Sequence, residues 1–170
     1  MPSKARWITA AALTGAAAVI ATVVLYPSHD PKAYPGSRSG FSFEEAQQQA
    51  SVPLPGCAQE TARFYLGPGF ADSTIVMDFT AGDECVESFL AGVGIDGSTP
   101  VVQWKPVFQE SGPPVEPPTG SGITWEFPRT DRVEYWTVER TDGVNDQSVL
   151  VVVNRSARPQ HVYIRAFPAD

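Results

Sequence analysis

Four strand candidates follow one another towards the end of the chain, and their spacing limits the folds open to it: GITWEF, RVEYWTVER, QSVLVVVN and HVYIRAF. Each is rich in β-branched and aromatic residues, and the runs PRTD, TDGVND and RSARPQ separate them. Such regular spacing is typical of a meander of antiparallel strands. We therefore expect the C-terminal part of the chain to form a sheet.

Earlier segments add further strands and two helices. ARFYL and STIVMDF read as a hairpin joined by the turn GPGFAD, and PVVQWKPVF is a strand candidate followed by a loop rich in proline and glycine. A capping box of Ser42 and Glu45 predicts a short helix over 43–50. In DECVESFLAGVGI the spacing of Val86, Phe89 and Leu90 predicts a second helix. The pattern indicates an α+β fold, a mainly antiparallel sheet with two short helices on one face.

The N-terminal segment predicts a membrane anchor. Residues 7–26 carry no charge, and about 20 apolar residues span a bilayer as one helix. The run ends at Tyr26 and Pro27, an aromatic at the expected interface and a helix terminator. A cleaved signal peptide, whose apolar region has roughly 7 to 15 residues, and a buried core helix are the alternatives.

Lys4 and Arg6 set the expected orientation. They precede the apolar run, so the positive-inside rule keeps a tail of residues 1–6 in the cytoplasm and places the remainder outside the cell membrane. If the segment is cleaved, the protein is secreted. Residues 27–40 contain three prolines, two glycines and three serines, and we expect a flexible spacer there. The extracytoplasmic domain then covers 41–170, with the fold beginning at Phe41.

The cysteine content agrees with an oxidising compartment. Cys57 and Cys85 are the two cysteines of the chain, and we expect them to form a disulfide. The disulfide would close a loop of about 29 residues, which contributes roughly 3 to 4 kcal/mol to the stability of the folded domain. Two free buried thiols and a metal site are the alternatives, but metal sites usually need four ligands and no cluster of histidine or cysteine accompanies either residue.

The charge distribution argues against a nucleic-acid partner. All 19 acidic residues and ten of the 12 basic ones lie beyond the apolar run, which leaves that part with a formal charge of −9. Such a surface repels phosphate backbones, and no run of lysine or arginine offsets it.

The strand patterns predict a binding face. Alternation in HVYIRAF places Tyr163 and Arg165 on the face opposite Val162 and Ile164. In QSVLVVVN the side chains that point to each of the two faces are apolar, as in a strand that is covered on both sides. We therefore interpret Tyr135, Tyr163 and Arg165 as a binding platform on the second face. The alternative is that the proline-rich loop or the first helix covers that face.

The sequence carries few catalytic signals. It contains no Gly-x-Ser-x-Gly, no phosphate-binding glycine loop and no His-Glu-x-x-His, and we predict no catalytic residues, metal or cofactor. His161 reads as an outward-facing strand residue. The carboxylate pairs Glu84 with Glu87 and Glu134 with Glu139 are candidates for acid–base chemistry, with solvated surface acids as the alternative.

The run SFEEAQQQASVPLPG, followed by FYL, STIVMDF and CVESFLAGVGI behind one apolar segment, resembles uncharacterised small anchored or secreted proteins of high-GC Gram-positive bacteria. The resemblance covers roughly residues 1–94. It implies a membrane location and no known activity, so no catalytic residue is carried over from it.

We interpret the protein as a non-enzymatic binding or interaction module at the cell envelope. Its partners would be the lipid bilayer, through residues 7–26, and an envelope protein. The alternatives are a secreted or anchored hydrolase that uses carboxylate acid–base chemistry, and an accessory subunit of a membrane complex.

Overall fold

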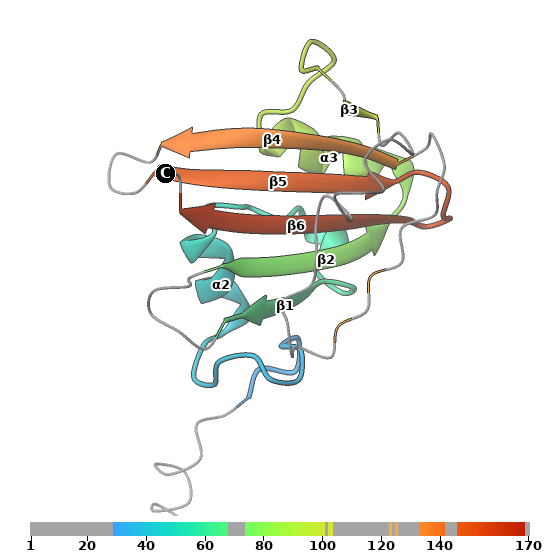
Figure 1. The fold of residues 1–170 in the computed structure, drawn as a ribbon. Coiled ribbons are helices and arrows are strands. Elements are labelled where there is room, and N and C mark those ends of the chain that lie inside the picture. Colours follow the sequence, from blue (N-terminus) through green and yellow to red (C-terminus); the bar gives the residue numbers. More distant parts are fainter. Residues whose placement is uncertain are drawn as a thin grey trace, which may run out of the picture.

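The computed structural model describes residues 29–67, 74–100, 102, 103, 123, 125, 133–141 and 146–168. Their centre is one antiparallel sheet with the strand order β1-β2-β6-β5-β4-β3, so the last strand of the chain lies between β2 and β5 (Figure 1). The strands are β1 Arg63–Leu66, β2 Ile75–Ala81, β3 Val102–Gln103, β4 Val133–Thr141, β5 Asp146–Asn154 and β6 Gln160–Pro168.

The predicted pairings of neighbouring strands are confirmed. β1 and β2 form the expected hairpin, with Phe64 opposite Met77. β4, β5 and β6 form the expected meander, with Trp136 opposite Val151 and Val151 opposite Ile164. Of the segment PVVQWKPVF, the structure describes β3 as a two-residue strand paired with β4. Ile123 and Trp125, the described residues of GITWEF, lie outside the strands.

Both predicted helices are present and lie on the same side of the sheet (Figure 1). Helix α2, Phe43–Gln49, begins with the predicted capping box: Ser42 Oγ accepts from the Glu45 backbone N–H, and Glu45 Oε2 accepts from the Ser42 N–H at 2.7 Å. Helix α3, Asp83–Gly92, ends where Gly94 takes a φ of +79°, a left-handed conformation that glycine adopts without steric cost.

The main core lies between the helices and the sheet. Phe43 of α2 packs against Phe64, with ring centroids 5.9 Å apart, and Phe79 of β2 meets Phe89 of α3 edge to face at 5.1 Å. The three residues predicted on the inner face of the second helix are all buried: Val86, Phe89 and Leu90. The α+β class with both helices on one face is therefore confirmed.

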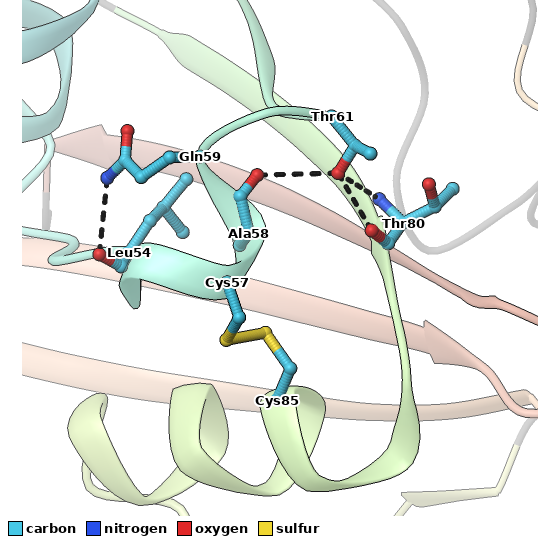
Figure 2. Close-up of a disulfide and its surroundings, with 7 residues drawn as sticks. All are labelled: Leu54, Cys57, Ala58, Gln59, Thr61, Thr80 and Cys85. Atoms are coloured by element: carbon cyan, nitrogen blue, oxygen red, sulfur yellow. Dashed lines mark hydrogen bonds between the residues drawn. A yellow bond between two sulfur atoms is a disulfide. The ribbon is translucent and has the colours of Figure 1, made fainter.

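The predicted disulfide joins Cys57 to Cys85, with Cα atoms 6.1 Å apart. It links the 3-10 helix η1, Gly56–Ala58, to the first turn of α3 (Figure 2). Beside it, Thr61 Oγ1 accepts from the Thr80 N–H at 3.1 Å and lies 2.7 Å from the Thr80 carbonyl oxygen. Together these contacts fasten the chain between the two helices to the end of β2.

The segment before α2 makes specific contacts with the sheet. Ala33 forms a parallel bridge with Phe64, the Tyr34 N–H donates to the Phe64 carbonyl at 2.8 Å, and the Arg38 N–H donates to the Leu66 carbonyl at 3.0 Å. Asp30 Oδ2 accepts from the Phe43 N–H at 2.8 Å. Where the sequence placed the start of the fold at Phe41, these contacts begin at Asp30, because the β1 backbone offers unpaired groups on its outer side.

The predicted anchor, residues 7–26, lies outside the described residues. Among the helices that the structure does describe, none has the length and apolar character needed to cross a membrane.

Candidate functional site

The face of the sheet that points away from α2 and α3 holds the candidate site, and we call it the helix-free face. Side chains opposite one another in the strand register share a face, so the pairs Asp78 with Tyr163 and Leu150 with Arg165 belong to it. Its buried centre comprises Val133, Val152 and Tyr163, against which Trp125, Tyr135 and Leu150 pack.

A buried carboxylate organises one half of this face. Asp78 of β2 accepts a hydrogen bond from the Tyr34 hydroxyl at 2.6 Å and lies 2.7 Å from His161 Nε2 through its other oxygen. Tyr34 comes from the segment before α2 and His161 from the start of β6. The carboxylate therefore joins three separate parts of the chain, and we call this group the Tyr34–Asp78–His161 cluster.

Electrostatics in this cluster favour a protonated phenol. Burial, the hydrogen bond to Asp78 and the negative charge of that carboxylate all raise the pKa of Tyr34 above its usual value. The nearby Arg63 acts in the opposite direction and does not outweigh them. Tyr34 thus remains a hydrogen-bond donor to Asp78 at every physiological pH.

Aromatic rings continue the site beside the cluster. The His161 imidazole stacks on the Tyr163 ring with centroids 4.1 Å apart, and Trp125 packs on Tyr163 at 5.0 Å with a tilted orientation. Trp125 follows the proline-rich loop in the sequence. Of the two elements proposed as a cover, the first helix packs on the opposite face instead, because its buried Phe43 contacts the helix-side core.

The three residues predicted as a binding platform lie on the helix-free face, but their exposure differs. Tyr163 is 3% exposed and forms the floor beneath Trp125 and His161. Tyr135 and Arg165 are half-buried, so part of each side chain reaches the surface. Tyr163 is thus a buried support for its neighbours, whereas Tyr135 and Arg165 each leave part of the side chain at the surface.

Arg165 occupies an apolar setting. Its direct cross-strand neighbours are Val76 on β2 and Leu150 on β5, and its guanidinium lies over the Phe167 ring, 5.6 Å from the ring centroid. The Nε atom of Arg165 is buried and has no hydrogen-bond partner. A cation among apolar groups without a protein acceptor is unusual, because buried polar groups are normally paired.

One glutamate from each predicted carboxylate pair bonds to the same arginine. Arg155, in the turn between β5 and β6, donates to Glu134 through Nε and to Glu87 through Nη1 at 2.8 Å, so it joins one member of each predicted pair. Glu84 is exposed on α3, and the Glu139 side chain lies outside the described parts of the structure.

The surroundings of Arg155 have the character of a structural ion-pair network. Burial acts to lower the pKa of Arg155, but the hydrogen bonds and charges of Glu134 and Glu87 outweigh it and raise the pKa. The Gln160 amide extends the network, since its oxygen accepts from Arg155 and its nitrogen donates to Asp83 on α3 at 2.6 Å. This network fastens the β5–β6 turn to α3.

The sequence did not predict Tyr34, Asp78 and Trp125 as members of the helix-free face. Asp78 had a usable signal, because an acidic residue within the apolar run STIVMDF must find partners if the strand is buried. Tyr34 and Trp125 had none, since their roles depend on contacts with strands distant in the sequence.

Comparisons with protein-family models, with curated proteins and with solved structures found no match for this chain.

Proposed function

We propose that the protein is a membrane-anchored extracytoplasmic binding module, and that its helix-free face receives an envelope protein. One observation carries the proposal: Tyr135, Leu150, Arg165 and Phe167 are half-buried side chains that adjoin on that face, and Arg165 lacks a hydrogen-bond partner at Nε. Exposed aromatic and arginine side chains are the types that dominate protein interfaces.

The supporting shell of this surface is rigid. Tyr163 precedes Arg165 by two residues on the same face of β6, and its cross-strand partner Asp78 belongs to the Tyr34–Asp78–His161 cluster, so contacts within the fold hold both. A binding surface backed by such a shell loses little conformational freedom when a partner docks.

The membrane location is the second part of the proposal. The uncharged run of residues 7–26 and the preceding Lys4 and Arg6 support an anchor with the domain outside, and the Cys57–Cys85 disulfide accords with an oxidising compartment. The intact mass of the protein from washed membranes tests it. Recovery of the full-length chain is expected, whereas a truncated species found only in the medium would show that the segment is a cleaved signal.

Photo-cross-linking in the native membrane tests the binding surface. Benzoylphenylalanine in place of Tyr135 is expected to capture an envelope protein, and the same group in place of Ser88, exposed on α3, serves as the matched control. A cross-linked species formed equally from both positions, or from neither, would overturn the assignment of the helix-free face.

A further inference from the structure

We propose that Arg165 is the specificity-determining residue of the helix-free face and binds a carboxylate on a peptide segment of the partner protein. The inference rests on the proposed function and adds the chemical class of the ligand. The helix-free face carries a carboxylate with two partners, Asp78, and an arginine whose Nε atom has none, Arg165.

Arg165 has no counter-ion among the residues that the structure describes. Asp78, a buried carboxylate on the same face, is already engaged by the Tyr34 hydroxyl through one oxygen and by His161 through the other. In the described part of the chain, the ion pairs that involve arginine are those of Arg155 and Arg158, which join the β5–β6 turn to β4 and α3. Among the side chains that the structure describes, none therefore neutralises the positive charge of Arg165.

The environment of Arg165 strengthens that attraction. Val76 and Leu150 flank the side chain in the register, and Phe167 lies beneath the guanidinium. Apolar neighbours lower the local dielectric, so a charge pair formed there is stronger than one formed in bulk water.

The shape of the surroundings selects the class of anion. The guanidinium is a planar fork whose nitrogens match the two oxygens of a carboxylate, and its terminal nitrogens belong to the part-exposed end of the side chain. Leu150 beside it and Phe167 beneath it offer apolar surface. The ligand that satisfies both features is a carboxylate flanked by apolar side chains, as an acidic residue or a chain terminus of a peptide provides.

A titration with small probes tests the proposal in vitro. The full chain, labelled with ¹⁵N-arginine and held in zwitterionic detergent micelles, is titrated with N-acetylphenylalanine and, separately, with its neutral amide. The Arg165 Nε–H resonance is expected to shift saturably with the carboxylate, with affinity on the order of millimolar for so small a probe, and to remain unmoved by the amide. Equal shifts with both probes would overturn the proposal.

Variants separate recognition from folding. Because the Arg165 signal disappears with the side chain, the variants are uniformly labelled with ¹⁵N and followed through the backbone amides of Leu150 and Phe167, the neighbours of Arg165. Arg165→Gln is expected to abolish the saturable response of these amides, and Arg165→Lys, which keeps the charge but loses the fork, to weaken the affinity about tenfold. Arg158→Gln, which removes an exposed cation in the β5–β6 turn, is the control and should bind as the wild type does. Retention of binding in Arg165→Gln, with an unchanged thermal midpoint, would overturn the assignment.

Two further arms resolve the source of the anion and the dependence on the proposed function. Inorganic phosphate that shifts the Arg165 resonance as strongly as the carboxylate would contradict a carboxylate site. Cross-linking from Tyr135 that persists in Arg165→Gln would overturn this inference alone. Binding of the probe together with a failure of all cross-linking would instead overturn the envelope-partner function and leave the carboxylate site standing.

Discussion

The two faces of the sheet are built from the same strands and stabilised in different ways. On the helix side, aliphatic and aromatic side chains from α2, α3 and five strands fill one continuous core. On the helix-free side, Asp78 forms directional bonds with Tyr34 and His161, and Arg165 stays unpaired at Nε. Hydrophobic burial is non-directional and tolerates no gaps, whereas a hydrogen bond is made in a definite direction to a particular group. The first face is therefore held by packing, and the second combines directional bonds with a smaller apolar cluster of Val133, Val152 and Tyr163.

The largest expected effect tests the helix-side core. Phe79→Ala should lower the free energy of unfolding by about 3 to 5 kcal/mol, because the ring is fully buried against Phe89. Leu150→Ala, on the helix-free face and half-buried, should cost roughly half of that or less. Urea unfolding measures both. Equal losses would mean that the two faces contribute alike and that the contrast between them is unfounded.

Removal of the disulfide comes next. Cys57→Ser combined with Cys85→Ser should lower the free energy of unfolding by about 3 kcal/mol, since the bridge spans a sequence separation of 28 and restricts the unfolded chain. Because the bridge lies on the helix side, binding of the carboxylate probe at Arg165 should be unchanged in the folded variant. A probe affinity that falls together with the stability would show that the two faces are coupled.

Loss of the Tyr34 hydroxyl tests the Tyr34–Asp78–His161 cluster. Tyr34→Phe should cost about 1 to 2 kcal/mol at pH 7, because buried Asp78 loses a donor while the ring volume is kept. Amide hydrogen exchange at Tyr34 and Arg38 should accelerate in the variant, since both N–H groups bond to the β1 backbone. Unchanged protection would mean that the segment is held by its backbone alone.

The raised pKa of Tyr34 predicts a pH dependence with a definite sign. The folded state holds the phenol proton more tightly than the unfolded state, so this stabilisation is complete below about pH 10, the ordinary tyrosine value, and declines as the pH rises towards the folded pKa. Urea midpoints from pH 8 to 11 should fall more steeply in the wild type than in Tyr34→Phe. Parallel curves would contradict the assignment.

The smallest effect concerns the cap of α2. Ser42→Ala should lower the free energy of unfolding by about 1 kcal/mol, because the Glu45 N–H loses its acceptor at the helix start. Ser39→Ala, at an exposed position of the preceding segment, is the control and should change the stability by less than about 0.5 kcal/mol. A comparable loss in the control would point to a general effect of the segment.

Much of the fold was predictable because its signals are local. The capping box of Ser42 and Glu45, the buried triplet of α3 and the alternation within β6 each depend on residues a few positions apart. The candidate site was predictable only in outline. Alternation placed Tyr135, Tyr163 and Arg165 on one face, but the depth of Tyr163 depends on Trp125 and His161, which strand pairing and a distant segment bring to it.

The sequence by itself determined both helices, the strands β1, β2, β4, β5 and β6, and the disulfide partners, since these follow from periodicity, turn chemistry and the presence of two cysteines. Only the tertiary structure decided that β6 lies between β2 and β5, and that order brings His161 and Arg165 beside Asp78 and Val76. It likewise decided that Tyr34 reaches Asp78 across 44 positions. The physical reason is that long-range pairing is selected by the packing of whole faces, and no short stretch of residues records that choice.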